Sequence, residues 1–255
     1  MKAVYKKEDI LRRIDHTELR PTATREDFER LFEEATKNHV AAVCVPPNWV
    51  HEARLSIPRE VRVCTVIGFP LGYNTEATKQ FEMCEAIKLG ADEIDMVINI
   101  GGAVESGPSR PDLKKEILGM RQVIKKLAIE SRSWSKSMNS DRGEFRLDDI
   151  TLKVIVETCY LNEAQKIELC ECVTKAGADY IKTSTGFGPG GATLEDVRLF
   201  RKHIGPNVKI KAAGGISTIE DAIRFIDAGA DRIGSSKLVR LLAADERTEY
   251  EIEVI

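Results

Sequence analysis

The sequence lacks the patterns that mark disulfide frameworks and common metal sites. Its six cysteines form no Cys-x-x-Cys pair, and its four histidines form no His-Glu-x-x-His cluster. The cysteines lie at positions 44, 64, 84, 159, 170 and 172, and the histidines at 16, 39, 51 and 203. We therefore expect free thiols in a reducing compartment and no structural metal.

Long apolar runs and an excess of one charge are also missing. No segment approaches the ~20 apolar residues of a membrane span, and "MKAVYKKEDILRRIDH" lacks the apolar run of a signal peptide. Lys and Arg number 38 against 41 Asp and Glu, so the net charge of -3 creates no general attraction for nucleic acid or anionic membrane. We expect a cytoplasmic protein without nucleic-acid or membrane partners, which holds any anionic ligand locally.

What the sequence does contain is an alternation of short β-branched runs with amphipathic helical stretches. This pattern is typical of βα units around a parallel sheet. The strand candidates span residues 13–17, 40–45, 61–69, 93–99, 151–158, 179–185, 208–213 and 231–236. Eight units in 255 residues predict a single (β/α)8 barrel domain over residues 1–255, with a doubly wound open sheet as the alternative.

Two features modify this regular pattern. The turns "LGADEID", "AGADYIK" and "AGADRIG" at 89, 176 and 228 repeat one helix-to-strand connection, as expected of a barrel of similar units. By contrast, "SRSWSKSMNSDRGEFRLDD" at 131–149 is polar, serine-rich and too long for an ordinary turn. We expect a solvated surface insertion opposite the active site; a subunit contact through Trp134 and Phe145 is the alternative.

Charged residues are predicted to point into the barrel. Alternate residues of a parallel strand face the covering helices, and that set should be apolar. In 93–99 the apolar set is Ile94, Met96 and Ile98, which turns Asp95 inward. The same test turns Lys153 and Glu157, Lys182 and Ser184, and Lys209 and Lys211 inward on the later strands. Since an unpaired buried charge costs several kcal/mol, this cluster indicates a functional site; a self-neutralising structural ion network is the alternative.

Lys182 has two possible uses in such a site. It is either a fixed cation for an anionic substrate or a nucleophile that forms an imine with a carbonyl, which requires a neutral amine. Burial and a neighbouring cation both disfavour the ammonium form, and Lys211 on the next strand supplies such a cation. This favours the imine, with Asp95 as the nearest inward acid/base.

Glycine-rich loops follow three consecutive strands. "TGFGPGG", "AGGIST" and "IGSS" come directly after the strands at 179–185, 208–213 and 231–236. Glycine lets backbone N–H groups approach a ligand closely, and helix N-termini favour anions. These loops therefore predict a phosphate site in the place where many barrels keep one.

With these motifs in view, the chain resembles the deoxyribose-phosphate aldolases, a family of Schiff-base (class I) aldolases built on a (β/α)8 barrel. The resemblance runs through "IDHTELRPTAT", "AAVCVPPNWV", "TVIGFPLG", "DEIDMVINIG", "KVIVETCYL", "ADYIKTSTGFG", "KIKAAGGIST" and "ADRIGSS". It covers the chain except for the tail and residues 131–149. The lysine motif and the second lysine in "KAAGG" are its most specific parts.

The resemblance implies reversible cleavage of 2-deoxy-D-ribose 5-phosphate to D-glyceraldehyde 3-phosphate and acetaldehyde, without a metal or organic cofactor. It also implies a homo-oligomer. Lys182 corresponds to the imine-forming lysine, Lys211 to the lysine that perturbs it, and Asp95 to the proton donor and acceptor, acting through a water. The implied substrate and phosphate contacts are Gly186, Gly214, Gly215, Ser217, Gly234, Ser235 and Ser236.

The chain departs from the family pattern at three places. Arg20 replaces a frequent lysine and keeps the charge, and "GSSKL" replaces Gly-Thr-Ser-Ser-Gly, which leaves the register of the serines open and adds Lys237 as a cation. Some relatives end in a tyrosine that assists proton transfer, a role that Tyr250 could take. The alternatives are another Schiff-base barrel aldolase on a phosphorylated sugar and a non-catalytic phosphosugar-binding barrel.

Overall fold

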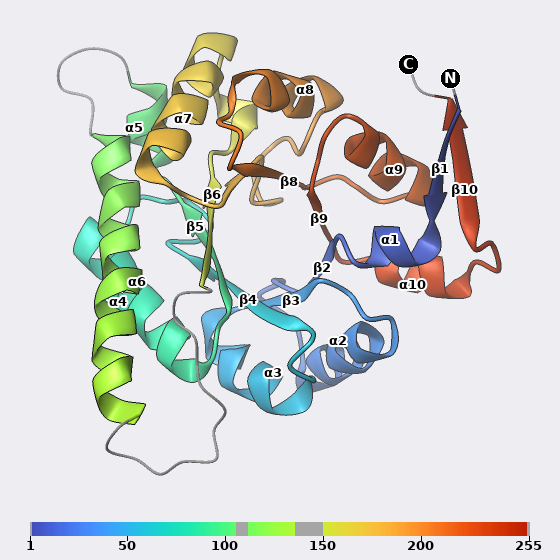
Figure 1. Cartoon of the computed structure of the whole chain (residues 1–255), viewed down its shortest axis with the longest axis horizontal. Coiled ribbons are helices and arrows are strands. Elements are labelled where there is room, and N and C mark those ends of the chain that lie inside the picture. The colour runs from blue at the N-terminus through green and yellow to red at the C-terminus, as the bar shows by residue number, and fades with distance from the viewer. Residues whose placement is uncertain (1, 106–111, 136–149, 254–255) are drawn as a thin grey trace.

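The computed structural model describes residues 2–105, 112–135 and 150–253. Within these residues eight parallel strands close into a barrel in the order β2-β3-β4-β5-β6-β7-β8-β9 (Figure 1). The strands are β2 (Ile14–Thr17), β3 (Ala42–Val45), β4 (Arg62–Ile67), β5 (Glu93–Val97), β6 (Thr151–Ile155), β7 (Tyr180–Lys182), β8 (Lys209–Ala213) and β9 (Arg232–Ser235). Each predicted strand is confirmed, although each is shorter at one or both ends, and the open-sheet alternative is wrong.

Helices surround the barrel, most of them in the connections between successive strands. The longer ones are α2 (Arg25–Lys37), α4 (Glu76–Leu89), α6 (Leu113–Ser135), α7 (Glu163–Ala176), α8 (Leu194–His203) and α9 (Ile219–Asp227). The shorter ones are α1 (Lys7–Leu11), α3 (Val50–Ser56), α5 (Ile100–Val104), α10 (Leu238–Ala244) and the 3-10 turns η1 (Pro47–Trp49) and η3 (Thr158–Tyr160). Thr or Asn caps many of them: the side chains of Thr24, Thr75, Asn162, Thr193 and Thr218 each accept from a first-turn N–H.

The predicted alternation of side chains is confirmed in the core. Ile94 and Met96 of β5 are fully buried in the apolar layer between strands and helices, together with residues such as Phe28, Met83 and Phe200. The neighbouring strands are in register, so that Asp95 lies beside Lys153 and Lys182 beside Lys211. This register places the inward side chains of different strands in common layers.

The polar segment predicted at 131–149 lies largely outside the described residues. Helix α6 extends to Ser135, so the first part of that segment continues the helix. Residues 136–149 are not described, and their predicted role stays a prediction. Among the described residues, none of the helices has the length and apolar character to cross a bilayer.

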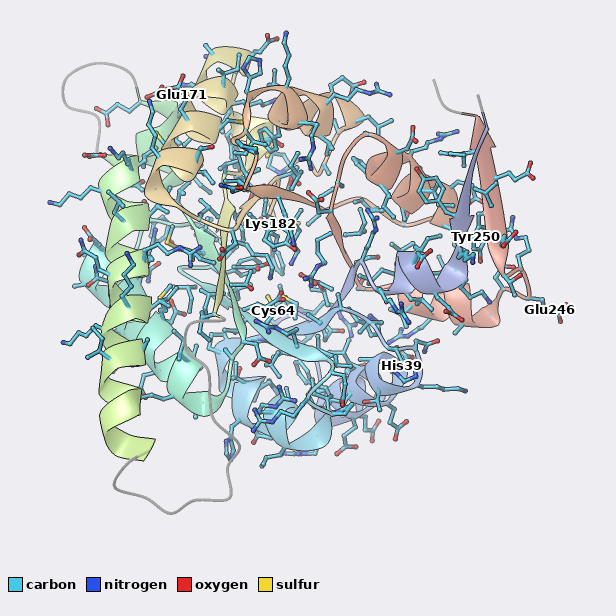
Figure 2. The ribbon with its side chains drawn as sticks, in the orientation of Figure 1. His39, Cys64, Glu171, Lys182, Glu246 and Tyr250 are labelled. Carbon is cyan, nitrogen blue, oxygen red and sulfur yellow. The ribbon has the colours of Figure 1, made fainter. Side chains whose placement is uncertain are left out.

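A two-stranded ribbon joins the two ends of the chain, and the sequence patterns did not predict it. Strands β1 (Lys2–Lys6) and β10 (Glu249–Glu253) pair antiparallel, with Tyr5 opposite Tyr250. The Tyr5 hydroxyl donates to Asp227 at the end of α9 at 3.0 Å, and the Arg247 guanidinium lies 4.7 Å from the Tyr250 ring centre. Figure 2 shows Tyr250 on this ribbon, apart from Lys182 in the barrel. In this structure Tyr250 therefore takes no part in the predicted site.

Candidate active site

Lys182 is the last residue of β7 and projects into the barrel near the carboxyl ends of the strands. Its side chain is almost completely buried, with 3% of the residue exposed. The Nζ atom donates to Oδ2 of Asp95 at 2.7 Å. Lys182 also lines a cavity that opens at this end of the barrel, so its amine lies between a buried carboxylate and space for a ligand.

Asp95 is fully buried and is the centre of the charged cluster. Its Oδ1 accepts from Lys153 Nζ at 2.7 Å, and its Oδ2 accepts from both Lys182 and Lys211 at 2.7 Å. The structure thus brings together the three predicted catalytic residues, Lys182, Lys211 and Asp95. Lys153, which the alternation test turned inward without a role, is the third lysine on the same carboxylate.

The cluster continues toward the amino-terminal end of the barrel through residues that were not predicted. Lys211 also donates to Asp15 of β2, and Lys153 lies 2.7 Å from Glu93. Arg232 of β9 bridges Asp15 at 2.6 Å and Glu93 at 3.3 Å. Together, Asp15, Glu93, Asp95, Lys153, Lys182, Lys211 and Arg232 form one connected set, named here the barrel ion network.

The ion pairs of this network outweigh the effect of burial at Asp95 and Lys211. Burial raises the pKa of Asp95, but the surrounding lysines hold it well below the ordinary carboxyl value. Burial lowers the pKa of Lys211, but Asp15 and Asp95 raise it above the ordinary lysine value. Lys211 is therefore a permanent cation beside Lys182, and Asp95 is ionised.

The cavity at the carboxyl end has a volume of about 290 Å³. All seven residues predicted to bind substrate or phosphate line it, namely Gly186, Gly214, Gly215, Ser217, Gly234, Ser235 and Ser236. Lys182 closes one side, and Arg20 and Lys237 add two cations. The three glycine-rich loops thus meet around one space, as the sequence predicted.

Three of these glycines have backbone conformations that other residues rarely adopt. Gly186 and Gly214 both have φ of +84°, and Gly215 has φ of +79°. A Cβ atom on Gly214 would also lie 3.0 Å from Gly191 Cα, which is closer than such contacts normally come. A side chain at position 214 would therefore push apart two of the loops that form the cavity.

The serines after β9 differ in what they can offer a ligand. The Ser235 hydroxyl donates to Ile216 O and accepts from the N–H groups of Lys237 and Leu238, so the protein already uses it. Ser236 and Ser217 are exposed at the cavity. The Ser235 hydroxyl therefore helps to fix the loop, whereas Ser217 and Ser236 are exposed at the cavity, and the contacts of the three serines with a ligand stay a prediction.

Glu157 supports the loop that follows Lys182. Its backbone is left-handed with φ of +53°, which is uncommon for a residue with a side chain. Its carboxylate accepts from the Thr185 N–H at 3.2 Å and from the Thr185 hydroxyl, and the Phe187 N–H donates to that hydroxyl at 3.0 Å. Burial raises the pKa of Glu157. We assign Glu157 a structural contact with the loop, one that strand alternation could not reveal.

Cysteine and carboxylate atoms near Asp95 are close enough together to be considered as metal ligands. Cys44, Cys64 and Asp95 offer ligand atoms within 4.8 Å of one another. However, Asp95 already accepts from three lysine Nζ atoms, two of them the cations Lys153 and Lys211, and burial raises the pKa of the Cys64 thiol well above its ordinary value. These two cations and a neutral thiol disfavour a further cation at this position.

Comparisons with known proteins give a consistent result, although no family model matches the chain. The chain is 46% identical to the deoxyribose-phosphate aldolase of Clostridioides difficile over 241 residues, which cover 94% of this chain and 99% of that one. It is 47% identical to the deoxyribose-phosphate aldolase of Caldanaerobacter subterraneus over 235 residues, 92% of each chain. Among solved structures, the deoxyribose phosphate aldolase of Aeropyrum pernix superposes with a TM-score of 0.75 at 30% identity, covering 93% of this chain and 91% of that one.

Proposed function

The chain belongs to the deoxyribose-phosphate aldolase family, and on that premise we propose that Lys182 forms the imine with the substrate aldehyde. As a class I aldolase the protein cleaves 2-deoxy-D-ribose 5-phosphate to D-glyceraldehyde 3-phosphate and acetaldehyde. One observation supports the assignment above all others. Of the three lysines that contact Asp95, Lys182 is the one that lines the cavity. The family assignment favours this reaction over the other aldolase and non-catalytic alternatives.

The reaction follows from the chemistry of an imine at Lys182. The neutral Nζ adds to the C1 aldehyde of the open-chain sugar, and loss of water gives an iminium. When the C3 hydroxyl loses its proton, the C2–C3 bond breaks, its electron pair passes to the iminium to give an enamine, and glyceraldehyde 3-phosphate leaves. Protonation at C2 and addition of water then release acetaldehyde and regenerate the lysine.

Asp95 and Lys211 are assigned supporting roles. Asp95 lies 2.7 Å from Lys182 Nζ, but unlike Lys182 it does not line the cavity. We therefore propose that Asp95 moves protons through Lys182 or a bound water. Lys211 shares the same carboxylate oxygen at 2.7 Å and remains a cation because Asp15 and Asp95 raise its pKa. A fixed cation at this position favours the neutral form of Lys182.

We propose that the glycine loops bind the 5-phosphate, which predicts a strong preference for the phosphorylated sugar. The loops offer backbone N–H groups and the hydroxyls of Ser217 and Ser236, and Lys237 supplies positive charge, while the charge of Arg20 is paired with Glu18 of the same cavity. Deoxyribose without phosphate should show kcat/KM lower by at least ~10²-fold, because phosphate binding positions the reacting end. The test compares kcat/KM for the two sugars by acetaldehyde release; equal values would contradict the assignment.

We also propose a cytoplasmic homo-oligomer. The six cysteines carry free thiols in the structure, as predicted, which suits a reducing compartment. Exposed apolar side chains on or just before the neighbouring helices α3 and α4 support association: Leu55 is 74%, Tyr73 is 73% and Phe81 is 69% exposed. The Aeropyrum pernix relative is described as tetrameric.

Light scattering should therefore give a mass that is a multiple of the monomer mass. Phe81→Glu should shift the distribution toward smaller species, because a charge would be buried in the contact. Glu171→Gln, an exposed position on α7 away from this surface, serves as the control and should leave the mass unchanged. A monomeric wild-type protein at micromolar concentration would refute the proposal.

A further inference from the structure

The barrel ion network contains more cations than carboxylates. Its seven members are the cations Lys153, Lys182, Lys211 and Arg232 and the carboxylates Asp15, Glu93 and Asp95, and the more exposed Arg62 lies 3.6 Å from Glu93 at the edge of the network as a further cation. Six of these seven residues are 3% exposed or less, and the Arg232 side chain is 13% exposed. An uncompensated charge in such surroundings costs several kcal/mol. The surplus of positive charge becomes smaller when one of the cations gives up its proton.

The number of carboxylate partners indicates which cation that is. Arg232 cannot lose its proton in a protein. Lys153 has three carboxylates within 4 Å, Asp95 and Glu93 at 2.7 Å and Asp15 at 3.5 Å. Lys211 contacts two, Asp15 and Asp95, whereas Lys182 contacts only Asp95 among the described residues. Lys182 is therefore the lysine of the network with the fewest carboxylate partners.

Arg232 is the member of the network farthest along the chain of contacts from Lys182. Its Nη1 donates to Asp15 Oδ1 at 2.6 Å, and the other oxygen of Asp15 accepts from Lys211. Lys211 and Lys182 then share Asp95 Oδ2. Burial lowers the pKa of Arg232, but Asp15 and Glu93 raise it further above its ordinary value, so its charge is permanent.

We propose that Arg232 is a positioning residue that acts from the amino-terminal end of the barrel. It supplies the surplus positive charge that keeps Lys182 in its neutral, nucleophilic form. The inference rests on the proposed role of Lys182 as the imine-forming residue. It adds a residue of β9 that does not line the substrate cavity, and instead lines a separate space of about 440 Å³ at the opposite mouth.

A test of this proposal must leave the other charged and titratable groups around Lys182 and Arg232 unchanged. Around Lys182 these are Asp95 of β5, Lys211 of β8, Cys44 of β3, and Lys153 and Glu157 on or just after β6. Around Arg232 they are Asp15, Glu93 and Tyr180, with Arg62, Asp179 and Lys209 lining the same space. Single substitutions at Arg232 and Glu93 leave all the remaining groups in place.

The experiment measures the pH dependence of imine trapping with acetaldehyde and cyanoborohydride, and of kcat/KM for deoxyribose 5-phosphate. In Arg232→Gln the acid limb of both profiles should move to higher pH by roughly 0.5–1 unit. This is the order of shift expected when one unit charge is removed from the surroundings of a titrating group at an effective dielectric constant of ~20. The rate at high pH should change little. Arg232→Lys should restore the wild-type limb because it keeps the charge.

Glu93→Gln supplies a second test with the opposite sign. Removing a carboxylate increases the cation surplus, so the acid limb should move to lower pH. The inference would be overturned if the acid limbs of folded Arg232→Gln and Glu93→Gln stayed at the wild-type pH. It would also be overturned if both limbs moved in the same direction. If Arg232→Gln does not fold, an unmoved limb in Glu93→Gln has the same consequence. Wild-type enzyme without trapped label at Lys182 would instead contradict the proposed function, so the two failures are distinguishable.

Discussion

Lys182→Arg should lower kcat for cleavage of deoxyribose 5-phosphate by at least ~10⁴-fold, as expected when a covalent nucleophile is removed. Arginine is long enough to donate to Asp95 as Lys182 does, but its guanidinium cannot form the imine. The loss should therefore appear in kcat, while the phosphate loops remain able to bind substrate. Steady-state kinetics with coupled detection of glyceraldehyde 3-phosphate measures this directly.

Lys209→Arg is the matched control for this substitution. Lys209 also belongs to the inward register of the barrel, on β8, but it is exposed at the amino-terminal mouth. Its replacement by arginine should leave kcat within about twofold of wild type, since surface substitutions that keep the charge change little. Substantial turnover in folded Lys182→Arg would move the nucleophile to another lysine.

Asp95→Asn should lower kcat by ~10² to 10⁴-fold, the loss typical of a general acid or base. Asparagine keeps the size of the side chain but removes its basicity. The substitution also increases the cation surplus of the barrel ion network, so Lys182 should still form the imine. Turnover should fall while trapping with acetaldehyde and borohydride persists. A correctly folded variant with near-normal kcat would remove Asp95 from proton transfer.

The same variant should also be less stable, because three lysines lose the carboxylate that they share. The pKa of Asp95 is depressed in the folded state, so its contribution to stability is present above the ordinary carboxyl pKa and is lost as the pH falls. The difference in Tm between wild type and Asp95→Asn should therefore narrow as the pH is lowered below about 4. A constant difference across this range would contradict the depressed pKa.

Much of the site followed from strand alternation alone. Because Ile94, Met96 and Ile98 had to face the helices, Asp95 had to face the interior, and the same test placed Lys153, Lys182 and Lys211 there. The structure confirms these positions. Applied to 13–17 and 231–236, the test would also have turned Asp15 and Arg232 inward, since Ile14 and Ile233 take the apolar side. The inward positions of Asp15 and Arg232 could therefore have been predicted from the sequence as well.

Other features depend on contacts between distant segments and could not be inferred from local patterns. The ribbon of β1 and β10 pairs residues at opposite ends of the chain, and it carries Tyr250 away from the interior. Lys79 lies on a helix, yet it is fully buried and donates to Val97 O at 2.8 Å and to Glu116 Oε1 at 2.5 Å. The left-handed backbone of Glu157 likewise depends on its contact with Thr185, a partner far along the chain.

The most direct test of the account locates the covalent bond itself. Wild-type protein is incubated with acetaldehyde, reduced with borohydride, digested and analysed by mass spectrometry. The account predicts one stoichiometric ethyl group, on the peptide that contains Lys182, and none on the peptides of Lys153 or Lys211. An ethyl group on either of those lysines with Lys182 unmodified, or label that persists in Lys182→Arg, would contradict it.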